Sequence, residues 1–358
     1  MKKQKLISDA LADFSLMPDI QQTDLLTECE ITDDTEIPPQ NPIIYVDGRK
    51  YLMEGDFAIV TGLKKAGKSH VMRRLIFTSL MAEIPEDYDT FRIRTVPAGK
   101  KYVVYVDTEQ HPSKTKEMRT YCWKRAGYKS QPPNLKTYNI RHKETEERVA
   151  FIEKLMNDFG DKIHLLIVDG VSDLLDSIND EIQSKKLAQA FFSSKNKSIS
   201  FVFAIHERSG GGGAMGWLGQ HIEKKAGGGI MIQKDSKTDT HSINCSFLRD
   251  DGNFKPIEFK YDENLKDFRT LDPSESLFLK EKTKEEKDKE KLLEIETHII
   301  KSFGGAKELS KAHLLQLVIT NDPKQRGEKS ARRIIADCQK LGLILETDKK
   351  LFKLNIEK

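Results

Sequence analysis

Short apolar runs recur through the middle of the chain, and segments with the period of a helix separate them. Runs that are apolar throughout predict strands buried on both faces. Such strands, alternating with helices, are typical of a parallel sheet covered on both sides, so we expect an α/β fold. The expected strands cover residues 57–60, 102–106, 165–168 and 201–205, and the expected helices cover 70–81, 146–159 and 180–193.

Further strands are expected around this core. Apolar runs at 43–46 and 50–53 flank Asp47-Gly48, and this dipeptide between two such runs predicts a β-hairpin. We expect three more strands to be antiparallel and to lie at the sheet edge; they cover 230–233, 241–247 and 257–261.

The C-terminal part has a different pattern. Residues 280–291 are almost only Lys and Glu, which is typical of a solvated helix or a linker. Three helical periods and two short apolar runs follow, which is the order of a winged helix. The helices are expected at 292–303, 311–320 and 328–341, the last ended by Gly342, and the strands at 343–345 and 351–354.

These patterns divide the chain into four parts. Residues 1–40 are polar and acidic, with a short helix expected at 8–17, so we predict an N-terminal arm. The α/β core is expected over 41–270, a charged linker over 271–291, and a small winged-helix-like domain over 292–358.

Composition narrows the class of protein. The chain has 358 residues, of which 37% are hydrophobic and 32% charged, as in globular proteins. No apolar run approaches the ~18 residues that cross a bilayer, and no apolar segment follows Met1 as in a signal peptide. We therefore expect a cytoplasmic protein without a membrane partner. The four cysteines form no CxxC pair, which excludes a zinc ribbon and argues against a disulfide framework.

A phosphate-binding motif follows the first core strand. Gly62-x4-Gly67-Lys68-Ser69 lies between that strand and a helix, where glycines let backbone N–H groups surround a phosphate. Lys68 can reach the β- and γ-phosphates, and the Ser69 hydroxyl can ligate Mg²⁺. The alternative is an ordinary glycine turn. We expect ATP and Mg²⁺ to bind here, through Gly62, Leu63, Lys64, Lys65, Ala66, Gly67, Lys68, Ser69 and His70.

Two carboxylates follow neighbouring core strands. Asp169 ends the strand at 165–168 and can hold Mg²⁺ opposite Ser69. Glu109 lies just past the strand at 102–106, where it could orient the attacking water, and Asp107 is the competing candidate. A helix N-terminal acid or an exposed loop residue are the alternatives for Glu109.

His206 ends the strand at 201–205, so it could sense the γ-phosphate. The run from Ser209 to Gly216 is rich in glycine and predicts either a mobile loop that reaches a central channel or a plain linker.

The ordered set of motifs resembles the RecA/DnaB superfamily of ATPases, and most closely its RepA-type branch of small hexameric helicases from plasmids and mobile elements. The resemblance covers residues 41–265 and implies a RecA-like P-loop NTPase core. It also implies ATP binding by Gly67, Lys68 and Ser69, Mg²⁺ coordination through Asp169, water activation by Glu109 and γ-phosphate sensing by His206.

The resemblance also implies a homo-oligomeric ring, for example a hexamer, whose sites are completed by a basic residue of the next subunit. Arg249 matches the arginine of the usual Lys-x-Arg pair. Phe247 stands at the lysine position, so the chain departs from the pattern there. An ordinary surface or salt-bridged arginine is the alternative for Arg249.

Basic residues gather in the C-terminal domain. Between Lys280 and Lys358 there are 19 basic and 14 acidic side chains, although the whole chain carries only +3. In the helix at 328–341 we expect Ala331, Ile334, Ile335, Cys338 and Leu341 to face the core. We expect contacts with duplex DNA from Lys329, Arg332, Arg333 and, at a wing tip, Lys349 and Lys350. Protein docking is the alternative.

Three functions fit these features to different degrees. The first is an ATP-driven motor on DNA, with single-stranded DNA at the core, such as a replicative helicase or loader of a plasmid or mobile element. The second is a non-motor ATPase switch that controls a DNA-bound regulator or partition factor. A small-molecule kinase is disfavoured, because no Arg-rich lid follows Asp169.

Overall fold

The structure is a computed structural model that describes residues 29–37, 39–192, 198–208, 213–322 and 324–355. The helix expected at 8–17, most of the arm and residues 209–212 of the glycine run lie outside this range. By its contacts the chain divides into two units, Met1–Asn41 and Pro42–Lys358. The described residues of the first unit are exposed.

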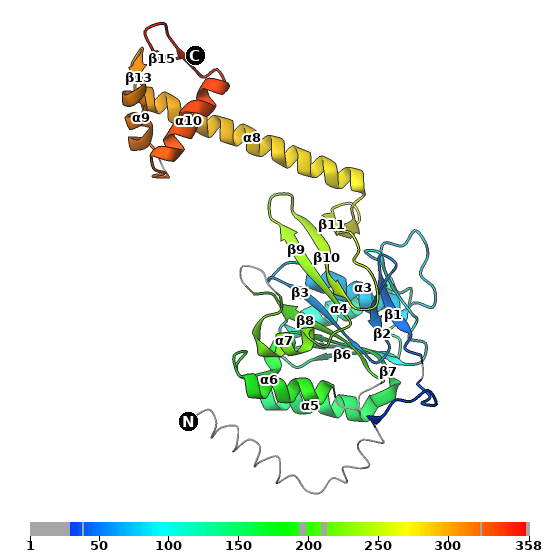
Figure 1. Ribbon diagram of the computed structural model, residues 1–358. Helices are drawn as coiled ribbons and strands as arrows, with labels where there is room; N and C mark the ends of the chain where they lie inside the picture. The colour runs from blue at the N-terminus through cyan, green and yellow to red at the C-terminus, as the bar shows by residue number, and fades with distance from the viewer. Residues whose placement is uncertain (1–28, 38, 193–197, 209–212, 323, 356–358) are drawn as a thin grey trace, which may run out of the picture. The chain divides into compact units, whose positions relative to one another are not determined.

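A nine-stranded sheet forms the centre of the second unit (Figure 1), in the order β12-β11-β10-β9-β3-β8-β7-β5-β6. Its strands are β3 (Phe57–Gly62), β5 (Tyr102–Asp107), β6 (Leu135–Asn139), β7 (Ile163–Asp169), β8 (Ser200–His206), β9 (Gly228–Asp235), β10 (Thr240–Leu248), β11 (Ile257–Asp262) and β12 (Asp267–Thr270).

The sheet is parallel from β9 to β6 and antiparallel from β9 to β12. This confirms the expected α/β class with a mainly parallel sheet. One detail differs, because β9 runs parallel to β3, so the antiparallel part begins one strand later than expected. The reason is the connection, because the helix Gly216–Glu223 lies between β8 and β9, and a helical crossover brings the chain back in the same direction.

Helices cover both faces of this sheet. One apolar core joins alternate residues of the strands to α3 (Lys68–Leu80) and α4 (Pro112–Arg125). The other alternate residues pack against α5 (Thr145–Phe159), α6 (Glu181–Phe191) and α7 (Gly216–Glu223), and Figure 1 shows α5 and α6 along that side. Two short 3-10 turns, Gly160–Lys162 and Val171–Leu174, flank β7.

A small second sheet has the order β2-β1-β4. The expected hairpin is present as β1 (Pro42–Val46) and β2 (Arg49–Met53), and β4 (Ile93–Thr95) pairs with β1. Asp47 and Gly48 both have positive φ, 51° and 76°, which the two-residue turn of such a hairpin requires.

The C-terminal region has its own apolar core, built by three helices and a three-stranded sheet of order β13-β15-β14. The elements are α8 (Pro273–Phe303), β13 (Leu309–Ser310), α9 (Lys311–Thr320), α10 (Glu328–Lys340), β14 (Ile344–Glu346) and β15 (Leu351–Leu354).

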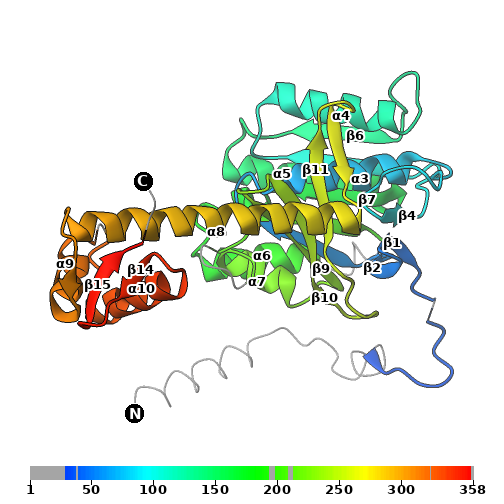
Figure 2. The same cartoon turned by 90° about the horizontal axis from the view of Figure 1, so that it is seen from above.

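The helix expected at 292–303 begins much earlier than the sequence pattern suggests. Helix α8 has 31 residues and includes the Lys/Glu run, and Figures 1 and 2 show it as one uninterrupted helix. A capping box between Asp272 and Glu275, with Pro273 at the first helical position, starts the helix at this point. The run at 280–291 is thus a solvated helix rather than a flexible linker.

Candidate nucleotide site

The phosphate loop connects β3 to α3, as the motif predicts. A Cβ on Gly62 would lie 2.5 Å from the carbonyl oxygen of Ile232, so this backbone passes too close to β9 for a side chain. Gly67 precedes the first turn of α3 with φ 106°, in the left-handed region that favours glycine. Both glycines are therefore required by the local geometry.

Lys68 is half-buried at the mouth of this loop. Its Nζ donates to the carbonyl oxygens of Gly62 at 2.9 Å and Leu63 at 3.4 Å, and it lies 3.2 Å from Nδ1 of His206. Burial lowers the pKa of the Lys68 ammonium, and the nearby carboxylates of Asp169, Glu109 and Glu207 offset only part of this shift. The ammonium is thus held by short contacts inside a group of acidic side chains.

His206 joins Lys68 to Glu109. The other nitrogen of its ring, Nε2, lies 3.0 Å from Oε1 of Glu109, and the two side chains are 17% and 36% exposed. This hydrogen bond is the main reason why the pKa of Glu109 is lowered, with smaller contributions from Lys68 and Lys64. Three residues that belong to three different strand ends or loops therefore form one continuous set of contacts.

Asp169 ends β7 and is 6% exposed. Its Oδ2 accepts a hydrogen bond of 2.7 Å from the hydroxyl of Tyr105, a fully buried residue of β5. Burial raises the pKa of Asp169 to about 6, and the negative charges of Asp107 and Glu109 add to this. A cation beside Asp169 would relieve that repulsion, so the carboxylate fits a Mg²⁺ site together with the hydroxyl of Ser69.

Asp107 has a different environment from Glu109. Its Oδ1 accepts from the backbone N–H groups of Glu109 and Gln110, its Oδ2 accepts from the Thr115 hydroxyl at 2.7 Å, and the side chain is fully buried. Gly170 leaves space for Glu109 on the other side, since a Cβ there would lie 2.7 Å from Cγ of Glu109. Asp107 thus fixes the turn, and Glu109 is the more open carboxylate.

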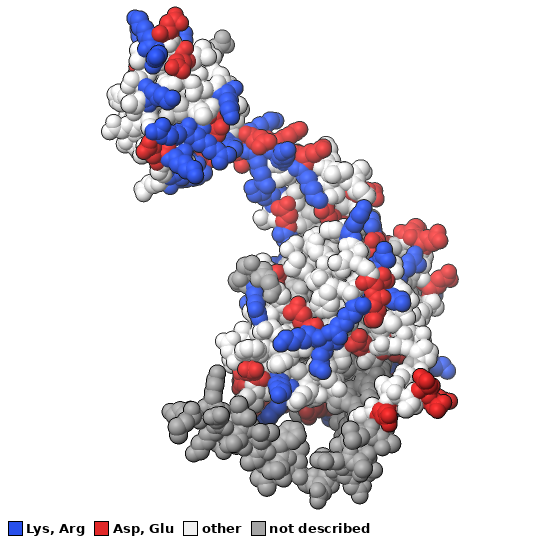
Figure 3. Space-filling view, in the orientation of Figure 1, with Lys and Arg blue, Asp and Glu red and all other residues white. Residues whose placement is uncertain are grey.

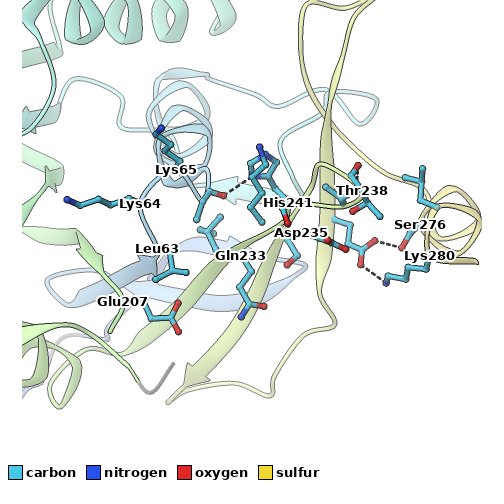
Figure 4. A pocket seen from close by; sticks show the side chains of 18 residues that line it. Leu63, Lys64, Lys65, Glu207, Gln233, Asp235, Thr238, His241, Ser276 and Lys280 are labelled. Carbon is cyan, nitrogen blue, oxygen red and sulfur yellow. Dashed lines mark hydrogen bonds and ion pairs between the residues drawn. The ribbon is translucent and has the colours of Figure 1, made fainter. Parts of the chain in front are cut away.

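The remaining loop residues point in several directions. Leu63, Lys64 and Lys65 are exposed, and Figure 4 shows the two lysines leaving the loop on different sides. The imidazole of His70 packs against the ring of Phe268, with centroids 3.8 Å apart and the planes tilted by 37°, and burial lowers the pKa of His70 to about 3. The His70 ring is therefore neutral and packed, which leaves its backbone for a nucleotide.

Arg249 lies outside the cluster of Lys68, His206 and Glu109. It follows β10 and is exposed, and its Nη2 donates to the backbone carbonyl of Lys224 at the end of α7. Together with Phe247 and Lys224 it borders a cavity of about 330 Å³.

A larger cavity, of about 680 Å³, borders the outer side of the phosphate loop. The loop, the β9–β10 hairpin and the first turns of α8 line it (Figure 4). Glu258 of β11 accepts a hydrogen bond from Ser276 and forms an ion pair of 2.6 Å with Lys280, so the start of α8 is attached to the sheet. No pattern in the sequence indicates this cavity.

The basic face of α10 comprises Lys329, Arg332, Arg333 and Lys340, all of which are exposed. The opposite face of α10 carries the expected buried residues, except that Leu341 is 51% exposed and does not belong to the core. It falls just after the last helical residue, where the helical period no longer applies. Lys349 and Lys350 are exposed in the turn between β14 and β15, and Figure 3 shows Lys and Arg side chains gathered on this part of the chain.

Neither a membrane-spanning helix nor a metal-binding cluster is found among the described residues. In this part of the chain, no helix is both long and apolar enough to cross a membrane. Within the same residues, no group of three or more His, Cys, Asp or Glu side chains could hold a metal ion by itself. The Mg²⁺ site at Ser69 and Asp169 would therefore depend on phosphate oxygens and water as well as protein groups.

The strand order and the phosphate loop are consistent with a RecA-like core, since β8 lies between the loop strand β3 and β7, which ends in Asp169. No known protein family matches the sequence, and no curated protein does. Some solved structures are similar to this chain over part of its length. One is the KaiC-like protein PH0186 of Pyrococcus horikoshii OT3, which is 12% identical over 62% of this chain and 92% of its own, with a TM-score of 0.43.

Proposed function

We propose that the protein binds and hydrolyses ATP with Mg²⁺ and couples this reaction to DNA. The contact series from Lys68 through His206 to Glu109, beside the buried Asp169, is the observation that supports the proposal most directly. A loop that only turned the chain would have no need for a lysine, a histidine and two carboxylates at its mouth.

Each group has a role that its position supports. The N–H groups of the loop and the first turn of α3 would surround the phosphates, and Lys68 would move from the loop carbonyls to the β- and γ-phosphates. Ser69 and Asp169 would hold Mg²⁺, which neutralises phosphate charge. Glu109 would orient the attacking water and accept its proton.

His206 would report the state of the γ-phosphate. Its ring contacts both the lysine that binds the phosphate and the carboxylate that orients the water. If Lys68 moved to a phosphate, Nδ1 of His206 would lose its contact with Lys68 and could contact the phosphate as well. His206 lies at the end of β8, and Glu207 and Arg208 separate it from Ser209.

The C-terminal domain would contact duplex DNA. The order of its elements fits a winged helix, the basic face of α10 is exposed, and the turn at Lys349 and Lys350 lies where a wing would be. With single-stranded DNA at the core, this would make the protein a replicative helicase or loader of a plasmid or mobile element, assembled as a homo-oligomeric ring in the cytoplasm. Arg249 would act on the site of the next subunit.

One observation favours a non-motor ATPase switch as the second candidate. Arg249 donates to a carbonyl of its own chain, and Phe247 replaces the lysine of the usual pair. A chain without an acting trans residue would hydrolyse ATP slowly, and nucleotide state could then regulate a DNA-bound assembly instead of driving movement.

The test is ATP turnover without DNA, with single-stranded DNA and with a forked duplex, together with native mass in the presence of an ATP analogue. A hexamer whose turnover is stimulated by single-stranded DNA and which unwinds the fork supports the motor. Slow turnover by a monomer, with no unwinding, supports the switch. No turnover under any of these conditions would contradict both.

A further inference from the structure

His241 of β10 packs against the outer side of the phosphate loop. Its Nδ1 lies 2.7 Å from the carbonyl oxygen of Ala66, and the side chain is 5% exposed. A Cβ on Gly67 would lie 2.8 Å from the same nitrogen, so the ring and the loop are in close contact. His241 belongs to none of the sequence motifs of the site, and only the pairing of β9 with β3 and with β10 brings it to the loop.

The hydrogen bond has a direct consequence for the loop. The C=O of Ala66 and the N–H of Gly67 belong to one planar trans peptide unit, so they point in opposite directions. With the carbonyl held toward β10, the Gly67 N–H is turned toward the inner side of the loop, where a phosphate would lie. We propose that His241 is a positioning residue, which orients the Gly67 N–H for phosphate binding from behind the loop.

The ring of His241 is itself fixed in place. It stacks on Phe259 of β11 with centroids 5.1 Å apart, and Phe268 meets its edge at 5.3 Å. The tautomer of His241 follows from its hydrogen bond. A carbonyl oxygen can only accept, so the bond requires the proton on Nδ1. Burial lowers the pKa of His241, which favours the neutral ring, and the bond to Ala66 selects the tautomer with the proton on Nδ1. One orientation of the donor is therefore maintained.

The competing explanation is that His241 only fills space beside the loop. Substitutions distinguish this packing role from the role of a hydrogen-bond donor. His241→Phe keeps a ring on Phe259 but removes the donor. His241→Asn removes the ring but places an amide nitrogen on Cγ, at the same distance from the backbone as Nδ1. His298→Phe is a matched control, because His298 is also 5% exposed and its Nε2 lies 2.9 Å from a carbonyl oxygen, that of Val318, in the C-terminal core.

This inference rests on the proposed function, so the experiment has one arm that needs no nucleotide. In that arm, hydrogen exchange is followed in the peptide that contains the phosphate loop. In the other arm, the Kd for Mg·ADP is measured by calorimetry. His241→Phe should speed exchange in the loop and raise the Kd about three- to tenfold, the range expected for one lost hydrogen bond. In His241→Asn the exchange rate and the Kd should both stay within about twofold of wild type, and His298→Phe should change neither.

Equal exchange and equal Kd in the Phe and Asn variants would overturn the proposal and leave His241 as a packing residue. If His241→Phe does not fold, His241→Gln serves as the second variant without the bond, because its amide nitrogen lies one carbon further out. If the wild-type protein shows no affinity for Mg·ADP, the proposed function fails, and the exchange arm still decides whether His241 orients the loop.

Discussion

Lys68 and Lys329 both lie in the first turn of a helix, yet their surroundings differ. Lys68 is half-buried, contacts two carbonyl oxygens and an imidazole, and has three carboxylates nearby. Lys329 is exposed on the basic face of α10. A charged side chain that is fixed and partly desolvated interacts strongly with one group of one ligand. Exposed charged side chains attract a ligand together, and salt screens this attraction. Substitutions should therefore have large, specific effects at the loop and small, additive effects on α10.

The sharpest test of this contrast is Lys68→Ala. Turnover of ATP should fall below detection and nucleotide binding should weaken, because the variant loses the side-chain cation placed at the β- and γ-phosphates. Steady-state turnover and calorimetry measure the two effects. Lys162→Ala, which removes an exposed lysine before β7, is the control and should behave as wild type. Turnover within about tenfold of wild type for Lys68→Ala would move the active site elsewhere.

Arg249→Ala should lower kcat by about 10³-fold with little change in ATP affinity, if Arg249 acts on the next subunit. Mixing this variant with Lys68→Ala should restore part of the activity, since each subunit supplies what the other lacks. Arg49→Ala, at another exposed arginine, serves as the control. A loss below about threefold without rescue on mixing would identify Arg249 as a structural residue that only ties β10 to α7.

Glu109→Gln should lower kcat by about 10²-fold or more and keep ATP bound, because the shape is retained and the base is lost. Asp107→Asn is the informative comparison. Since Asp107 accepts three hydrogen bonds inside the protein, its substitution should lower the melting temperature more than Glu109→Gln does. Normal turnover by Glu109→Gln would transfer the role of the base to Asp107.

On the basic face of α10, reversal of Lys329, Arg332 and Arg333 to Glu should weaken duplex DNA binding by about 10²-fold at roughly 0.1 M salt. If all three contact phosphates, the slope of log K against log salt should fall by about 2.7. Reversal of Lys282, Lys284 and Lys287 in the Lys/Glu run changes the net charge equally and is the control. The module should stay folded, because these side chains lie away from its core. Unchanged affinity and slope would reassign the module to protein docking.

The smallest effect is expected at Tyr105. Tyr105→Phe removes the hydrogen bond to Asp169, so the Mg²⁺ concentration for half-maximal turnover should rise about tenfold. The pKa of Asp169 should rise above its value of about 6, because the Tyr105 hydroxyl lowers it in the wild type. Tyr128→Phe, which removes a hydroxyl bonded to the Leu80 carbonyl, is the control. Equal Mg²⁺ dependence in both variants would show that Tyr105 does not position Asp169.

The parts of the fold that the sequence predicts well depend on short stretches of chain. The phosphate loop, the hairpin at Asp47-Gly48 and the strand that ends in Asp169 each carry their signal within a few residues. Helix α4 is not predicted, because only Thr115, Met118 and Cys122 are buried on it, too few to make an apolar stripe. The N-terminus of α8 has local signals in Asp272, Pro273 and Glu275, but the charged run that follows has no apolar period, so the pattern does not connect this start to the helix expected at 292–303.

Other parts of the site have no signal in the sequence at all. Tyr105 and His241 look like ordinary strand residues, and their contacts exist only because β5 lies beside β7 and β10 lies beside β9. Helical spacing places Leu341 in the core, but the helix ends one residue earlier. Pairing between distant strands decides contacts such as those of Tyr105 and His241, and one sequence carries little information about it.

The charged groups around Lys68 also affect whether ATP would enter the site free or as its magnesium complex. Glu109, Asp169 and Glu207 act electrostatically on the Lys68 ammonium, and Lys64 also acts on Glu109, so three carboxylates lie near two ammonium groups. Free ATP, a polyanion, would meet repulsion there once it passed the loop. The magnesium complex carries less negative charge and brings a cation to Asp169. We therefore expect the magnesium complex of ATP to enter the site more readily than free ATP does.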